Sequence, residues 1–178
     1  MEKKHLLICG AVGVGKTTLV RRLLAHSKRP LFGFSTLRLA QAGEDGLRPV
    51  YMYPAALGES ERENGEENLL ARCSREKKLV RSEVFDTLGV RLLHAERGGI
   101  VLMDELGFLE SDALAFQHAV LAALDADTPV AAVVKAQDTP FLARVKTHEN
   151  AALYTVTAQN RDELYAQLLP WIEQWNKA

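Results

Sequence analysis

The sequence contains no apolar run that approaches the roughly 18 consecutive residues a membrane helix needs. Its N-terminal apolar stretch is too short and too rich in glycine for a signal peptide. It also has only two cysteines, Cys9 and Cys73, which form neither a disulfide framework nor a metal-ligand spacing. These absences predict a cytoplasmic protein without a membrane partner.

An excess of charge of one sign is also lacking. The 22 Lys and Arg residues nearly balance the 23 Asp and Glu residues, and the formal net charge is −1. No overall positive field would therefore draw the protein to nucleic acid or to an anionic membrane, although a local basic patch is compatible with this composition. With 178 residues, of which 47% are apolar and 25% charged, the chain has the size and balance of one folded domain spanning residues 1–178.

Short apolar runs alternate with amphipathic segments along the chain. The runs lack a period of two, which is typical of parallel strands buried on both faces. We therefore expect an α/β protein with a mostly parallel sheet, helices on both faces of the sheet and an early β-hairpin insertion. The expected strands are 5–9, 34–40 and 48–53 (the hairpin), 98–105, 129–134 and 152–157. The expected helices begin at Lys16, near residue 82, at a Ser111 cap, at a Thr139 cap and at an Asn160-x-x-Glu163 cap.

Residues 58–78 depart from this pattern because 11 of these 21 residues are charged. Such a composition predicts a solvated, flexible loop rather than a packed element. The segment could also contact a protein partner, which the sequence does not identify.

The segment "GAVGVGKT", residues 10–17, matches the phosphate-binding pattern Gly-x-x-x-x-Gly-Lys-Thr between an expected strand and an expected helix. Its backbone N–H groups and the positive end of the helix dipole would surround phosphate oxygens. Lys16 would bridge the β- and γ-phosphates, and Thr17 would bind Mg²⁺. The pattern predicts a P-loop NTPase fold that binds a nucleoside triphosphate through Gly10, Ala11, Val12, Gly13, Val14, Gly15, Lys16, Thr17 and Thr18.

A second motif, "IVLMDE", ends an expected strand in Asp104 and Glu105. An acid at the carboxyl end of a strand beside the first strand can contact Mg²⁺, so we expect Asp104 and Thr17 to form the metal site. The following acid, Glu105, could orient and polarise a water for attack on the γ-phosphate. Without the phosphate loop, the same two acids would be explained equally well as the polar end of a buried strand.

Two motifs of well-known nucleotide-binding proteins are missing. The chain has no Asn-Lys-x-Asp for reading guanine, which argues against a Ras-like GTPase, and no Leu-Ser-Gly-Gly, which argues against a transporter ATPase cassette. Asn160 and Arg161 superficially match a base-reading motif, but a helix cap explains Asn160 equally well.

Four segments, in this order, resemble the family of small P-loop nucleoside-triphosphatases that includes the cancer-related nucleoside-triphosphatase and its archaeal and bacterial relatives. They are "GAVGVGKTTL", "GFSTLRL" (33–39), "LMDELGFLES" (102–111) and "VTAQNRDEL" (156–164). The resemblance implies Mg²⁺-dependent hydrolysis of nucleoside 5′-triphosphates, ATP and GTP among them, to diphosphate and phosphate with a loose base preference. It places Asp104 and Glu105 on the family's acidic pair and Gly107 on its glycine, with nucleotide contacts from Asn160 and Arg161.

The chain departs from this family at two places. Phe108 and Leu109 stand where the family commonly has Lys and Met, and Leu37 and Arg38 replace acids. These changes leave the source of a stabilising positive charge in the transition state open. The candidates are Lys135, Arg38, Arg144 and Arg161; Lys135 is the first choice because an expected strand end places it on the ligand edge of the sheet.

Two other functions use the same motifs. A phosphotransferase would keep the phosphate loop and use an acid of the Asp104–Glu105 pair as the base for an acceptor, such as a small molecule or a polynucleotide 5′-hydroxyl. A nucleotide-dependent switch would rearrange its hairpin and its 58–78 segment for a partner. Release of phosphate without an acceptor would separate hydrolysis from phosphotransfer.

Overall fold

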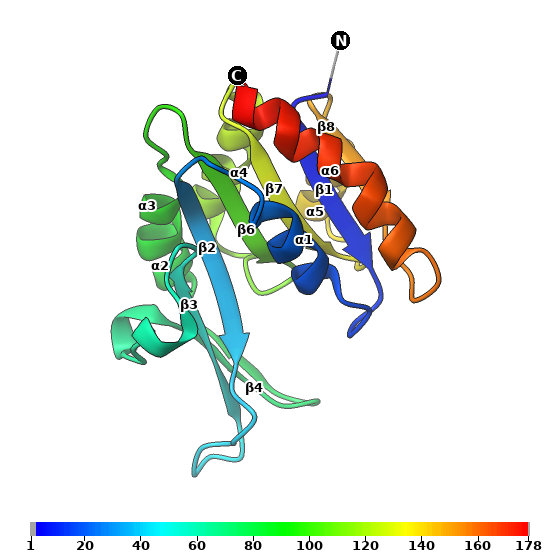
Figure 1. The fold of residues 1–178 in the computed structure, drawn as a ribbon. Coiled ribbons are helices and arrows are strands. Elements are labelled where there is room, and N and C mark those ends of the chain that lie inside the picture. The colour runs from blue at the N-terminus through cyan, green and yellow to red at the C-terminus, as the bar shows by residue number, and fades with distance from the viewer. Residues whose placement is uncertain (1–2, 178) are drawn as a thin grey trace.

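One eight-stranded β-sheet runs through the protein (Figure 1). The computed structural model describes residues 3–177. The strands lie side by side in the order β5-β4-β3-β2-β6-β7-β1-β8. Their bounds are β1 His5–Gly10, β2 Leu31–Arg38, β3 Arg48–Pro54, β4 Leu69–Cys73, β5 Lys78–Val80, β6 Ile100–Leu106, β7 Val130–Lys135 and β8 Ala151–Thr155.

The five strands β2, β6, β7, β1 and β8 are parallel to one another. The apolar runs of the central strands β6, β7 and β1 are buried on both faces; the side chains of Leu6, Leu7 and Ile8 in β1, for example, are completely inaccessible to solvent. This burial explains why these runs lack a period of two, since neither face of these strands is turned to water. The expected α/β fold with a mostly parallel sheet is confirmed.

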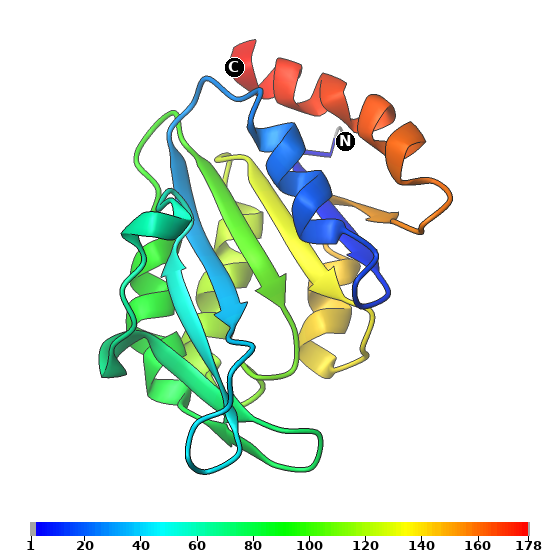
Figure 2. The same cartoon turned by 60° about the horizontal axis from the view of Figure 1, so that its bottom comes forward.

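Helices cover both faces of the sheet (Figures 1 and 2). Helices α1 (Lys16–Leu24) and α6 (Arg161–Lys177) share one apolar core with one face, through Leu19, Leu23 and Leu168 among others. The other face carries α2 (Ser82–Val84), a π-helical turn (Phe85–Gly89), α3 (Val90–Leu93), α4 (Leu114–Asp125) and α5 (Pro140–Lys146). No helix within residues 3–177 is long and apolar enough to cross a membrane.

Strands β2 and β3 pair antiparallel, as the predicted hairpin requires. The chain then continues antiparallel through β4 and β5, which pair with β3 and with each other. We call residues 48–80, from β3 through β5, the antiparallel arm. It lies along the outer side of β2, and its β4–β5 turn extends past the carboxyl ends of the parallel strands toward the bottom of Figures 1 and 2.

The prediction of one solvated loop over residues 58–78 is wrong. The segment contains two 3₁₀ turns, Glu59–Glu61 and Glu66–Asn68, the whole of β4 and the first residue of β5. Leu70 and Ala71 of β4 are fully buried, and both belong to the apolar core that also contains Val84 of α2. Apart from Arg72, the charged residues lie outside β4, and their number obscures this five-residue strand in the sequence pattern.

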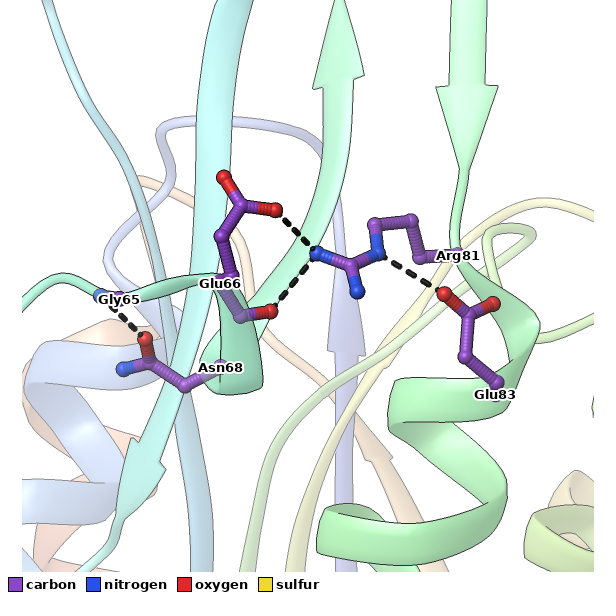
Figure 3. Close-up of polar contacts among 5 residues, drawn as sticks. All are labelled: Gly65, Glu66, Asn68, Arg81 and Glu83. Atoms are coloured by element: carbon purple, nitrogen blue, oxygen red, sulfur yellow. Dashed lines mark hydrogen bonds and ion pairs between the residues drawn. The ribbon is translucent and has the colours of Figure 1, made fainter.

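Hydrogen bonds from Arg81 fasten the second of these turns (Figure 3). The Arg81 guanidinium donates to the Glu66 carbonyl at 2.7 Å and to the Glu66 carboxylate at 2.8 Å, and its Nε donates to Glu83 at 2.8 Å. Within the turn, the side-chain oxygen of Asn68 accepts a hydrogen bond from the Gly65 N–H at 2.8 Å. The segment is thus tied to the start of α2.

The predicted helix caps have different outcomes. The Thr139 hydroxyl accepts from the Leu142 N–H, which confirms the cap of α5. Ser111 does not cap α4, because α4 begins at Leu114 and the Ser111 hydroxyl donates to the Phe108 carbonyl. Instead, Asp86 of the neighbouring π-helical turn accepts from the Phe116 N–H at 2.9 Å, so this helix end is satisfied by a residue distant in sequence.

Candidate active site

The carboxyl ends of β1, β6 and β7 meet at one edge of the sheet (Figure 1). The phosphate loop follows β1, Asp104 and Glu105 lie near the end of β6, and Lys135 ends β7. The sequence predicts that the strand carrying Asp104 lies beside β1. This prediction is wrong, because β7 lies between β6 and β1. The phosphate loop and α1 span this gap, since Thr17 at the start of α1 reaches Asp104.

The phosphate loop has the backbone conformation that its glycines permit. Gly13 and Gly15 have φ of 78° and 97°, a region that other residues adopt only with strain, and Gly15 is the N-cap of α1. Lys16 is buried, and its ammonium donates to the carbonyls of Gly10 at 2.9 Å and Ala11 at 2.7 Å. These two bonds hold the ammonium inside its own loop.

Thr17 and Asp104 are in direct contact. The Thr17 hydroxyl donates to Asp104 Oδ1 at 2.7 Å, and the Arg21 guanidinium lies 3.5 Å from Asp104 Oδ2. Asp104 is only 4% exposed. Burial raises the pKa of its carboxyl, while the Thr17 hydrogen bond and the Arg21 charge act in the opposite direction. A buried carboxylate beside a hydroxyl is a pair of hard oxygen ligands.

Glu105 and Lys135 form an ion pair with 2.6 Å between Oε1 and Nζ. The stem of Lys135 passes directly over Gly107, where a Cβ atom would lie only 2.8 Å from Lys135 Cδ. Glycine at this position therefore lets the lysine reach across from β7 to the acid on β6. Lys135 also lies 5.0 Å from the centre of the Phe108 ring.

Glu110 is a residue of this edge that the sequence analysis missed. Its side chain is 2% exposed, and its carboxylate accepts a hydrogen bond from the Gly107 N–H. Burial raises its pKa to about 7. The available signal was the glutamate that closes the Asp-Glu-Ile-Gly-Lys-Met-Glu pattern of the resembled family, at the position of Glu110 in this chain.

A cavity of about 400 Å³ joins these residues to the antiparallel arm. Thr17, Asp104, Glu105 and Lys135 line one side, and Arg38, Leu70 and Lys78 line the other. A second hollow of about 550 Å³ shares Thr17 and Asp104 with the first and is bordered by Arg21, Arg22 and Arg62. The metal-binding candidates thus lie where the two hollows meet.

The remaining candidates lie at different distances from this edge. Arg38 lines the first cavity with Lys135. The Arg161 side chain packs beside the phosphate loop, since a Cβ on Gly15 would lie 3.1 Å from its Nη1. Asn160 turns its side chain to the backbone of Thr155 and Thr157. Arg144 is exposed on α5 and is not among the described residues that line either hollow.

Comparison with known proteins shows the family of the chain. A family model described as NTPase matches residues 5–169. The chain is 32% identical to the nucleoside-triphosphatase THEP1 of Thermofilum pendens, with 94% of each chain covered, and 26% identical to the cancer-related nucleoside-triphosphatase homolog of Bos taurus, with 98% of this chain and 99% of the relative covered. The crystal structure of THEP1 from Aquifex aeolicus superposes with a TM-score of 0.72 at 21% identity, covering 95% of this chain and 99% of the other. The predicted resemblance is therefore confirmed, and the chain belongs to the NTPase family of enzymes.

Proposed function

We propose that this protein hydrolyses nucleoside 5′-triphosphates, ATP and GTP among them, to nucleoside diphosphate and phosphate in a Mg²⁺-dependent reaction. The observation that carries the proposal is the placement of two pairs, Thr17–Asp104 and Glu105–Lys135, on the wall of one cavity beside the phosphate loop. The first pair offers ligands for a cation, and the second offers a base and a positive charge. In-line attack on a γ-phosphate needs both.

The residues at the metal position fit Mg²⁺. The Thr17 hydroxyl and the Asp104 carboxylate supply oxygen, and they approach to 2.7 Å. Within residues 3–177 there is no group of three His, Cys, Asp or Glu side chains arranged to hold a metal. This fits Mg²⁺ bound to a nucleotide, which takes one or two protein ligands and fills its other positions with phosphate oxygens and waters. When bound, Mg²⁺ would neutralise charge on the β- and γ-phosphates.

The reaction that follows uses the chain's own residues. Lys16 holds the β- and γ-phosphates, and Glu105 takes a proton from a water as the water oxygen bonds to the γ-phosphorus. The bond between the γ-phosphorus and the β,γ-bridging oxygen breaks, and the electron pair leaves with the diphosphate. Lys135 pairs with Glu105 before nucleotide binds. The γ-phosphate of the bound nucleotide competes with Glu105 for the Lys135 ammonium. Nucleotide binding therefore weakens the ion pair and leaves the Glu105 carboxylate available to accept the proton.

A loose base preference is supported by the position of Arg161. Its long side chain packs on Gly15 at the outer side of the phosphate loop, and it is exposed. An exposed guanidinium can stack on any base, because every base has a π-face. Asn160, beside it, is occupied with backbone bonds to Thr155 and Thr157.

Phosphotransfer to an acceptor is the second candidate, and the size of the first cavity favours it. The cavity measures about 400 Å³, whereas one water occupies about 30 Å³ of liquid. Buried apolar side chains, Val50, Leu70 and Phe85, lie on its wall beyond the acids. A small acceptor with an apolar part could occupy this space next to the γ-phosphate.

The test is phosphate release from ATP, GTP, CTP and UTP with Mg²⁺ and without an acceptor. If the protein hydrolyses nucleotides, each of the four triphosphates should yield one diphosphate for every phosphate released. Glu105→Gln should bind nucleotide but lose turnover, and Lys16→Ala should lose turnover too. Glu149→Gln, at an exposed residue remote from the site, serves as the matched control. If Glu105→Gln hydrolyses at the rate of the control, Glu105 is not the base. If phosphate leaves the nucleotide only when an acceptor is present, the hydrolytic assignment is overturned.

A further inference from the structure

Phe108 stands where the resembled family commonly has lysine, yet two lysines lie against its ring. Lys78 Nζ is 3.8 Å from the ring centre, and Lys135 Nζ is 5.0 Å from it. The ring is half-buried and belongs to the loop after β6, next to Gly107. Residue 108 is therefore uncharged itself, but the ammonium groups of Lys78 and Lys135 lie next to its ring.

The two lysines come from opposite sides of the cavity. Lys135 ends β7 of the parallel sheet, and Lys78 begins β5 of the antiparallel arm. Lys78 pairs in register with Cys73, and the Cys73 carbonyl accepts a hydrogen bond from Arg38 at 3.3 Å. This bond links the tip of the arm to the end of β2, so that Lys78 is held over the cavity by the arm's own pairing.

Two of the three cations that line the cavity lack a carboxylate partner within residues 3–177. Lys135 has Glu105 as its partner. In the part of the chain that the structure describes, neither Lys78 nor Arg38 forms an ion pair, although both line the cavity. A cation–π contact at such a site is only a weak attraction. Two ammonium groups on one ring repel each other, and an anion between them would remove that repulsion.

We propose that Lys78 and Lys135, gathered on the Phe108 ring, form a binding site for a phosphate oxyanion. The oxyanion is the γ-phosphate of a bound triphosphate or the free phosphate that hydrolysis releases. Both sources rest on the proposed function, since the first needs a nucleotide in the phosphate loop and the second is released by hydrolysis. Lys78 then recognises the third phosphate group and ties the antiparallel arm to the triphosphate state. In this proposal the Phe108 ring positions Lys78 and Lys135, so that positive charge is present although residue 108 is not a lysine.

The experiment compares binding of three probes by calorimetry in the presence of Mg²⁺: the non-hydrolysable adenylyl imidodiphosphate, ADP, and ADP followed by inorganic phosphate. The variants are Lys78→Gln, which removes the charge, and Phe108→Leu, which removes the ring. Lys77→Gln removes a charge from the adjacent exposed residue and is the matched control. Thermal unfolding of each variant checks that it folds.

If the γ-phosphate is the ligand, Lys78→Gln weakens binding of the triphosphate analogue about tenfold or more and leaves ADP binding unchanged, as expected for loss of one charged hydrogen bond. If free phosphate is the ligand, the same variant weakens only the binding of phosphate to the ADP complex. Phe108→Leu should shift the same probe in the same direction. If Lys78→Gln and Lys77→Gln are indistinguishable with all three probes, the site is refuted. Because these are binding measurements, they stand whether or not the protein hydrolyses nucleotide, and normal hydrolysis with no effect of Lys78 would overturn the site alone.

Discussion

Lys135 Nζ lies 2.6 Å from Glu105 Oε1, and the lysine reaches this position across the open face of Gly107. The acid and the cation are on adjacent parallel strands, β6 and β7, so both lie at the carboxyl edge of the sheet. The pair can form because Gly107, which lies beneath the lysine stem, has no side chain. The distance between the proposed base and its counter-ion therefore depends on the glycine that follows β6.

Gly107→Ala tests this relationship. The added Cβ would lie 2.8 Å from Lys135 Cδ, so the lysine must move away from Glu105. We expect kcat for phosphate release to fall about tenfold or more, as for loss of a charged hydrogen bond, while nucleotide affinity and melting temperature change little. Gly58→Ala is the control, because its new Cβ would meet only the flexible end of Glu61. Unchanged turnover in Gly107→Ala would show that the position of Lys135 does not matter for the reaction.

The Thr17–Asp104 contact gives a prediction about metal. Thr17→Ala removes the hydroxyl that lies 2.7 Å from Asp104, whereas Thr17→Ser keeps it. The Mg²⁺ concentration for half-maximal phosphate release should rise by about tenfold or more in the alanine variant, because one oxygen ligand is lost. The serine variant should stay close to the native protein. Identical Mg²⁺ curves for the alanine and serine variants would remove Thr17 from the metal site.

Local signals account for the parts of the site that the sequence predicted. The phosphate loop is a contiguous pattern, and Asp104, Glu105 and Lys135 each follow an uninterrupted apolar run, which places them at strand ends. The order of the strands is not local. No pattern in β1 or β6 indicates that β7 lies between them, because that order depends on how the crossover helices pack.

Packing between distant segments explains what the sequence did not reveal. The strand β4 escaped prediction because Leu69, Leu70 and Ala71 are surrounded in sequence by charged turns, and their burial comes from the core beneath the arm. Glu110 escaped because a single carboxylate gives no periodic signal, and the loop after β6 buries it. The contact of Lys78 with Phe108 joins the arm to that loop, and neither residue alone suggests the other.

Glu110 should make stability fall as pH rises. Burial raises its pKa from its ordinary value of 4.5 to about 7, so between these values the folded protein keeps a proton that the unfolded chain has released. The free energy of unfolding therefore drops by about 3 kcal/mol across this window. Glu110→Gln can still accept the Gly107 hydrogen bond through its amide oxygen but cannot titrate. Its unfolding free energy relative to native should rise by about 3 kcal/mol from pH 4.5 to 7, measured by urea denaturation; parallel curves would contradict the shift.

His5 should act in the opposite direction over nearly the same window. This fully buried residue of β1 donates from Nε2 to the Leu124 carbonyl at 2.9 Å and accepts from the Val130 N–H at Nδ1, at 3.2 Å. That arrangement requires the neutral ring, and burial lowers its pKa from 6.5 to about 4. Between these values the unfolded chain holds a proton that the folded protein lacks, so the unfolding free energy rises with pH by about 3 kcal/mol.

The two titrations should therefore nearly cancel in the native protein between pH 4.5 and 6.5, and single variants should reveal each one. Relative to native, His5→Gln should lose about 3 kcal/mol of unfolding free energy as pH rises from 4 to 6.5, which is the reverse of the slope for Glu110→Gln. The double variant should run parallel to the native protein, because His5 in β1 and Glu110 in the loop after β6 share no hydrogen bond. His94→Gln, at an exposed histidine, is the control. If His5→Gln gives the same slope as this control, His5 is not held neutral by its buried position.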